Sequence, residues 1–186
     1  MRQPFKKSQI DVFESLNVTG KAIKQGVLLT TRWNNRVNSM TISWGQVGIE
    51  WNRPVFTAFV RGSRYTYEML LHHGEFTVNI PSGGNVEKIL NFCGTRSGRD
   101  TDKIRELGLT LVEGEKVSVP GIAELPITLE CKVIYRQMQD PKAIPHHILE
   151  EFYPQHRSGD PSMTGRDIHT MFYGEMVNSY LIENGK

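Results

Sequence analysis

The chain has 186 residues, 38% of them hydrophobic and 23% charged, which is enough to bury the core of one domain spanning residues 1–186. Its 22 lysines and arginines against 20 aspartates and glutamates leave a net charge of +2, too small to indicate a nucleic-acid partner. No apolar run approaches the roughly 20 residues that cross a bilayer, and residues 1–17 lack the apolar stretch of a signal peptide. We therefore expect a cytoplasmic protein with no membrane segment and with reduced cysteines at Cys93 and Cys131.

The first predicted elements are strands. Residues 26–33, "GVLLTTRW", are rich in β-branched residues, and the following "NNR" suits a hairpin turn. Residues 37–47 alternate, so that small polar side chains lie on one face of a strand and mostly large ones on the other. Pro54 opens a further strand at 54–61, which has the composition of a buried one.

Helices and strands then alternate to the end of the chain. The helix expected at 63–74 begins with Ser63 as N-cap and ends at Gly74. The other predicted elements are helices at 86–94 and 100–108, and strands at 75–81, 109–117, 126–139 and 168–182. Residues 140–167, with four prolines, form a polar excursion that is partly helical at 145–152 and of a length often found in lids or partner contacts. Many strands and only short helices favour a mainly β antiparallel barrel or sandwich.

The segment "RGSRYT", residues 61–66, lies where a strand passes into a helix. A helix N-terminus carries unpaired N–H groups and a positive partial charge. Ser63 adds a hydroxyl, and Arg61 and Arg64 add guanidinium groups that can grip phosphate oxygens. The segment fits a phosphate site, and it equally fits an ordinary capped surface helix with two solvated arginines.

The loop "NFCGTRSGRDTDK", residues 91–103, has glycines, hydroxyls and charges but no apolar periodicity. Ser97, Gly98, Arg99 and Lys103 would supply donors to an anion, and Asp100 would cap the next helix. Taken alone, it is best interpreted as a connection between two helices. Together with residues 61–66 it favours two loops that converge on one anionic ligand.

The strand "NSMTISW", residues 38–44, presents a small polar edge to which a flat heteroaromatic ring could be bound. Met40 or Trp44 would pack against such a ring. A half-buried strand with serine and threonine on its wet face has the same pattern.

The histidines and the common sequence motifs give weaker indications of function. The adjacent pairs at 72–73 and 146–147 point in different directions and do not form a metal site, and the chain has no GxGxxG, GxSxG or Walker motif. His169, just ahead of an apolar strand, is either a functional histidine or a hydrogen-bonded histidine at a strand end.

Taken in order, these segments resemble the flavin reductase-like family, and in particular its flavoredoxin-like branch. The matching pieces are 38–44, 61–66, 74–81, 92–103, 127–133 and 169–177, and they cover most of residues 26–182. The resemblance implies a six-stranded antiparallel split barrel that forms a homodimer and binds FMN noncovalently near the subunit interface. The reductases have Gly-Asp directly before the histidine, whereas this chain has Asp167 and Ile168 there.

The resemblance also implies which residues surround the cofactor. The isoalloxazine would lie against the strand edge formed by Asn38, Ser39, Met40, Thr41, Ser43 and Trp44. The phosphate or ribityl chain would be held by Arg61, Ser63, Arg64 and Thr66, with Ser97, Gly98, Arg99 and Lys103 completing the pocket. His169 would help to place a nicotinamide and is the candidate catalytic residue.

Three functions are consistent with this interpretation. The first is an oxidoreductase that passes hydride from NADH or NADPH through FMN. The second is a flavoredoxin-type electron carrier reduced by a protein partner. The third is a split barrel that binds a ligand without redox turnover.

Overall fold

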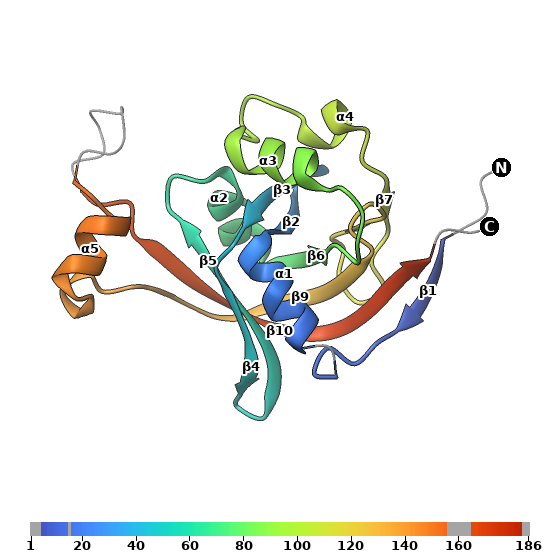
Figure 1. Cartoon of the computed structure of the whole chain (residues 1–186), viewed down its shortest axis with the longest axis horizontal. Coiled ribbons are helices and arrows are strands. Elements are labelled where there is room, and N and C mark those ends of the chain that lie inside the picture. The colour runs from blue at the N-terminus through green and yellow to red at the C-terminus, as the bar shows by residue number, and fades with distance from the viewer. Residues whose placement is uncertain (1–4, 15, 156–164, 184–186) are drawn as a thin grey trace.

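A computed structural model describes residues 5–14, 16–155 and 165–183. Its main feature is one eight-stranded antiparallel sheet in the order β3-β2-β6-β9-β10-β5-β4, with β1 paired to β10 (Figure 1). The strands are β1 Lys6–Gln9, β2 Val27–Trp33, β3 Arg36–Ile42, β4 Gly45–Glu50, β5 Arg53–Arg61, β6 Glu75–Ile80, β9 Ile127–Met138 and β10 His169–Glu183. The prediction of a mainly β fold is therefore confirmed. The strand number of six is too low, because β1 and β4 extend the sheet.

Short helices lie around this sheet. Their bounds are α1 Leu16–Gln25, α2 Tyr65–His73, α3 Glu87–Thr95, α4 Lys103–Leu107, η1 Pro141–Ala143 and α5 His146–Phe152. In Figure 1, α2, α3 and α4 gather beside β2 and β3, whereas α5 stands apart at the end of the long β9–β10 pair. None of the helices in the described ranges is long and apolar enough to cross a membrane.

The core forms where β2, β5, β6, β9 and β10 face one another. Phe56, Phe76 and Phe172 are fully buried there, with the rings of Phe56 and Phe76 edge to face at 6.4 Å. Gly174 on β10 makes room for Phe76, because a Cβ at this position would lie 2.4 Å from the Phe76 ring. Burial of such apolar surface is the main driving force for folding.

Two hairpin turns have positive φ at both central residues, as type I′ turns require. Asn34 and Asn35 join β2 to β3, which confirms the predicted turn, and Trp51 and Asn52 join β4 to β5. Asparagine tolerates this conformation well, whereas a tryptophan in it is unusual.

The strand predicted at 37–47 is wrong as one element. β3 ends at Ile42, and β4 begins at Gly45 and pairs with β5 instead of β2. A Cβ at Gly45 would lie 2.8 Å from the Phe56 ring, so glycine allows the chain to approach β5 closely as it changes partner.

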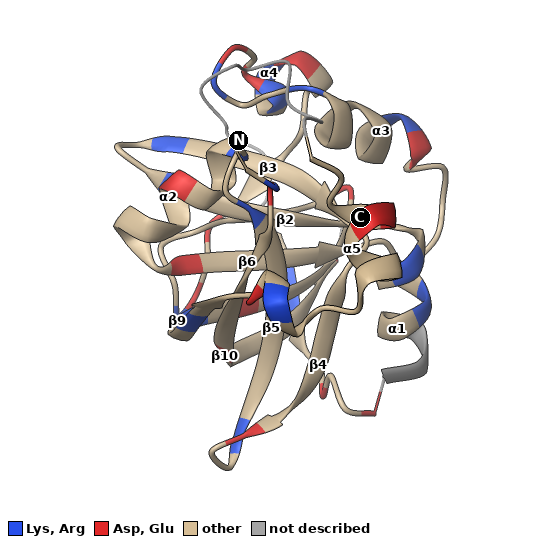
Figure 2. Ribbon diagram, turned by 90° about the vertical axis from the view of Figure 1, so that its left-hand side faces the viewer, with Lys and Arg blue, Asp and Glu red and all other residues tan. Residues whose placement is uncertain are grey.

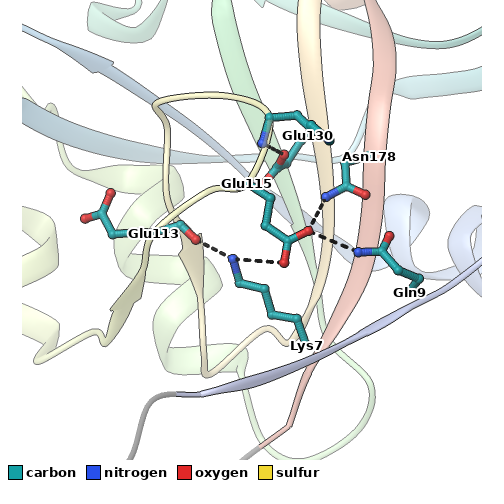
Figure 3. A network of polar contacts seen from close by, with 7 residues as sticks. Lys7, Gln9, Glu113, Glu115, Glu130 and Asn178 are labelled. Atoms are coloured by element: carbon teal, nitrogen blue, oxygen red, sulfur yellow. Dashed lines mark hydrogen bonds and ion pairs between the residues drawn. The ribbon is translucent and has the colours of Figure 1, made fainter.

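The strand predicted at 109–117 is also mostly wrong, since only β7, Leu111–Val112, pairs there, with β8, Gly121–Ile122. The fully buried Glu130 explains this. Its carboxylate accepts hydrogen bonds from the backbone N–H groups of Glu115 at 2.6 Å and Lys116 at 2.7 Å, which holds the segment as a loop. Figure 3 shows this network, in which the Glu115 carboxylate also accepts from Asn178 at 2.8 Å and Gln9 at 3.0 Å.

Candidate functional site

The turn between β5 and α2 contains the first predicted anion-binding segment. The helix begins at Tyr65 with Arg64 as N-cap and no side-chain cap, so the prediction that Ser63 caps it is wrong. Ser63 instead donates from its hydroxyl to Asp167 at 2.6 Å and from its N–H at 3.2 Å. Asp167, at the end of the 140–167 excursion, thus accepts the hydrogen bonds of Ser63, and the serine hydroxyl does not cap the helix.

Lys103, from the second predicted anion-binding segment, is the first residue of α4. Its side chain is almost fully buried, and within the described part of the chain its ammonium donates to one carbonyl oxygen, that of Cys93, at 3.2 Å. Burial, with a smaller contribution from the Arg64 charge, lowers the pKa of Lys103 to about 8. Asp102, not the expected Asp100, caps α4 by accepting from the Arg105 N–H at 3.1 Å. A buried ammonium without a carboxylate partner is costly unless an anion compensates it.

Arg64 and Lys103 both line one cavity of about 180 Å³, which we call the Lys103 cavity. Arg96 adds a third cation, and no acidic side chain is among the described residues that line the cavity. Elsewhere in the molecule basic and acidic segments are interspersed, as Figure 2 shows. The other lining residues of the Lys103 cavity are Asn38, Met40, Thr41, Ser63, Tyr65, Thr66, Cys93, Gly94, Thr95, Ser97 and Gly98.

A second cavity, of about 220 Å³, lies next to the first and shares Met40, Thr41 and Arg64 with it. We call it the His169 cavity. Its other lining residues are Ile42, Ser43, Trp44, Phe59, Arg61 and His169. The break between β3 and β4 at Ser43 and Trp44 therefore forms part of its wall.

Strand β3 supplies the shared wall of the two cavities. Asn38 donates from its side chain to the Thr66 hydroxyl at 2.9 Å, and Gly98 packs so closely that a Cβ there would lie 2.1 Å from the Asn38 oxygen. Thr41 donates to the Leu90 carbonyl at 2.6 Å. These contacts bring β3, α2 and the 93–103 loop together around one space.

His169 forms one end of the second cavity. Its Nδ1 lies 2.7 Å from the Tyr153 hydroxyl, which donates to Gln139 Oε1 at 3.0 Å, and its ring centroid is 4.8 Å from that of Trp44. Burial and the neighbouring Arg61 lower the pKa of His169 to about 4, so the imidazole is neutral at pH 7. With the Tyr153 proton donated to Gln139, Nδ1 is the donor to the tyrosine oxygen and Nε2 is an acceptor.

Three predicted residues serve mainly to hold neighbouring segments. Arg61 lines the His169 cavity but donates to the carbonyls of Asp167 at 2.7 Å and Phe152 at 2.9 Å. Arg99 does not line either cavity, and it donates to the Ser63 carbonyl at 3.0 Å and pairs with Glu68 at 3.1 Å. Ser39 is buried away from both cavities, with its hydroxyl 2.7 Å from that of Thr30.

Sequence reasoning missed four residues of this region: Tyr65, Arg96, Tyr153 and Phe59. Arg96 lies inside the loop that was singled out, and its charge was the available signal. Tyr153 belongs to the excursion, and nothing local in the sequence connects it with His169. Among the residues that the structure describes, no cluster of His, Cys, Asp or Glu could hold a metal ion.

Known proteins resemble this chain in sequence and in fold. The sequence matches the family described as flavin reductase like domain over residues 21–186. A curated relative, an uncharacterized protein of Archaeoglobus fulgidus, is 36% identical over 97 residues, covering 52% of this chain and 54% of that protein. The chain thus spans about half the length of this relative.

Solved structures with a similar fold include flavoredoxin of Desulfovibrio vulgaris, with a TM-score of 0.63 and 27% identity, covering 85% of this chain and 69% of that one. An FMN-binding domain of a flavin reductases-like enzyme from Shewanella baltica has a TM-score of 0.64 at 17% identity, covering 96% of this chain and 78% of that one. These similarities confirm the predicted split-barrel fold.

Proposed function

The chain belongs to the flavin reductase like domain family, and from this premise we propose that it binds FMN noncovalently and is an NAD(P)H-dependent flavin reductase or a related oxidoreductase. The observation that carries the proposal is the Lys103 cavity, where a buried ammonium and two arginines face a space without an acidic side chain among its described lining residues. A phosphate placed there would give Lys103 the anionic partner that its burial demands. The residues present therefore fit the phosphorylated flavin.

We assign the phosphate and ribityl chain to the Lys103 cavity. Arg64, Arg96 and Lys103 would neutralise the phosphate, and Ser97 and Gly98 would donate to it. Thr66 lies beside Asn38, whose amide would contact the ribityl hydroxyls. Arg99 and Ser63 act indirectly in this assignment, because their polar groups already bind Glu68 and Asp167.

We assign the ring system to the His169 cavity. Met40, Thr41, Ser43 and Trp44 would line the isoalloxazine, whereas Ser39 would contribute only through its backbone, since its side chain bonds to Thr30. When bound, the flavin supplies the hydride and electron chemistry, and the protein supplies orientation and charge.

His169 is the proposed catalytic residue. Because its imidazole is neutral and its Nδ1 is held by Tyr153, the Nε2 lone pair would be free to accept a hydrogen bond from an amide such as that of nicotinamide. The hydrogen bond to Tyr153 fixes the ring orientation, and burial together with the Arg61 charge keeps the ring unprotonated.

A second candidate is an electron carrier reduced by a protein partner. It is favoured by the 27% identity to flavoredoxin, which is above that of the reductase-like domain. Anaerobic mixing of the FMN-loaded protein with NADH or NADPH separates the two. Fast bleaching at the flavin absorption band supports the reductase, and persistent yellow colour supports the carrier. A colourless protein that takes up no FMN would support the third function, a split barrel that binds a ligand without redox turnover.

Assembly as a homodimer is part of the proposal. Trp51 and Ile49 at the β4–β5 hairpin are more than half exposed, and the Trp51 ring is 6.0 Å from that of Tyr135, which is itself 5.3 Å from Tyr173. Exposed aromatic groups of this kind mark interaction surfaces.

The first prediction tests the phosphate assignment. Replacing Arg64 by alanine should weaken FMN binding by roughly 1.5–3 kcal/mol, because it removes a charge-assisted contact. The same change should weaken the binding of riboflavin, which has no phosphate, far less. Fluorescence titration of both flavins measures this, with Arg105→Ala as the matched control because Arg105 is outside the Lys103 cavity and its side chain is 79% exposed. Equal losses for FMN and riboflavin would remove Arg64 from the phosphate site.

A further inference from the structure

A third cavity, of about 530 Å³, lies between α5 and the start of β4. It shares Ser43, Trp44 and Phe59 with the His169 cavity, so those side chains form the common wall of the two spaces. We call it the α5 cavity, because its outer side is formed by η1 and α5 of the polar excursion. Neither the family match nor the proposed flavin site assigns a role to it.

The lining of the α5 cavity is apolar and aromatic. Its main side chains are Trp44, Phe59, Ile144, Pro145, Ile148 and Phe152. The amides of Gln46 and Gln139 and the hydroxyls of Ser43 and Tyr153 are its polar groups, and no charged side chain is among the described residues that line it. A site of this composition favours a neutral ring with one polar substituent, since a charged ligand would lose its hydration without gaining a counter-ion.

The helix α5 lines the cavity with two apolar side chains. None of its seven residues is buried, yet Ile148 and Phe152 both face the cavity. The helix is nevertheless held in place, because Arg61 donates to the Phe152 carbonyl at 2.9 Å and Arg166 to the Leu149 carbonyl at 3.3 Å. A helix anchored by its backbone, with apolar side chains over an open space, is suited to cover a ligand.

Two further contacts connect the α5 cavity with the proposed active site. The Trp44 and Phe152 rings meet edge to face at 5.3 Å, and Tyr153 contacts His169 from the same segment. A ligand under α5 would therefore lie one side chain away from the space assigned to the flavin ring.

We propose that the α5 cavity is the second-substrate site of this protein and that it binds a neutral aromatic compound carrying one carbonyl or hydroxyl group. The substituent hydrogen-bonds to Gln139, Gln46 or Tyr153, while the ring lies between Ile148 and Phe59. The role of this compound as a substrate rests on the proposed flavoprotein function. Its binding does not require FMN turnover.

The test compares two probes of the same shape, 4-methoxybenzaldehyde and 4-methoxybenzoate, by calorimetric titration of the protein saturated with FMN. We expect the neutral aldehyde to bind at least tenfold more tightly than the carboxylate. Ile148→Asp should weaken aldehyde binding at least tenfold by placing a charge in the cavity, and Ile148→Trp should do the same by filling it. Leu71→Asp is the matched control, because Leu71 is a comparably exposed apolar residue of α2 that does not line the cavity.

The outcomes separate this inference from the proposed function. Aldehyde binding that depends on Ile148 in a protein that takes up no FMN would support the cavity and overturn the flavoprotein proposal. FMN uptake with equal affinity for the two probes, or with no effect of either Ile148 variant, would overturn the cavity alone. Conversion from dimer to monomer by Ile148→Asp, without aldehyde binding to the wild type, would assign the cavity to a second copy and overturn it as well.

Discussion

At the residue scale, the buried Lys103 has the largest consequence for ligand binding. Its pKa in the free protein is lowered to about 8, and a bound phosphate would raise it again by pairing with the ammonium. A group whose pKa is raised by binding contributes affinity that is fully present below the free pKa and is lost as the pH rises above it. The second phosphate ionisation lies near pH 6, as for other phosphate monoesters.

We therefore predict that FMN affinity is highest between about pH 6 and about pH 8 and falls as the pH rises further. Titrations of FMN across this range measure the effect. The matched variant Lys103→Met, which keeps the length and removes the charge, should bind FMN more weakly and show no fall above pH 8. A wild-type affinity that is flat from pH 7 to pH 10 would contradict the phosphate contact.

The residue types in the sequence indicated which segments surround the Lys103 cavity, but not which contacts the individual side chains make. Arg64, Thr66, Gly98 and Lys103 all reach the Lys103 cavity, as the two loops indicated, whereas Asn38 of β3, expected against the flavin ring, lines it as well. Ser39 does not, because alternation along a strand tells which side chains share a face but not whether that face meets a ligand or a buried polar neighbour such as Thr30.

The same limit applies to the arginines. The partner of Arg99, Glu68, lies 31 residues earlier in the chain, and the carbonyls that accept from Arg61 lie about 100 residues later. Such pairs are fixed by the tertiary arrangement, and no local pattern reveals them. Charge alone therefore identified the loops but not which guanidinium group faces the cavity.

At the element scale, most strands and helices followed from local pattern. β2, β5, β6, β9 and β10 lie within one residue of their predicted bounds at each end. β1, α1 and β8 were not predicted. Two other differences were decided by neighbours: β4 by its pairing with β5, and the 113–118 loop by the carboxylate of Glu130. Local propensity does not contain these tertiary contacts.

The long strand β10 yields the element-scale prediction. Gly174 lies at a shift of register, where an added Cβ would be 2.4 Å from the Phe76 ring and 2.8 Å from the Cys131 Cβ. Gly174→Ala should therefore destabilise the fold by about 1–3 kcal/mol through overpacking. Gly48→Ala on β4 is the matched control, because nothing lies within 4 Å of the Cβ that it adds. Urea unfolding of both variants measures the difference, and equal stabilities would mean that the core yields at Phe76 without cost.

At the scale of the whole molecule, the long β9–β10 pair connects regions that the sequence treats as separate. One end carries the 113–118 loop and β1, and the other end carries α5 (Figure 1). Tyr135 of β9 and Tyr173 of β10 lie on this pair, and Trp51 of the β4–β5 turn contacts Tyr135. The sequence predicted a dimer only through resemblance, since exposure of these rings depends on how the sheet curves.

The hairpin that carries Trp51 offers a test of the dimer that does not depend on damaging the fold. Both central residues of its turn have positive φ, 49° at Trp51 and 60° at Asn52. Asparagine is favoured there and tryptophan is not, so Trp51→Asn should leave the monomer at least as stable. The same change removes a side chain that is 58% exposed and, in our proposal, buried between subunits.

We predict that Trp51→Asn shifts the protein from dimer to monomer at micromolar concentration, measured by sedimentation equilibrium, without lowering the midpoint of thermal unfolding at a concentration where the variant is monomeric. Leu71→Asn, which removes a comparably apolar exposed side chain from α2, should leave the dimer intact. If FMN lies near the subunit interface, the monomeric variant should also bind it more weakly. A wild-type protein that sediments as a monomer at all concentrations would contradict the interface, because the aromatic side chains of the hairpin would then have no partner to bury them.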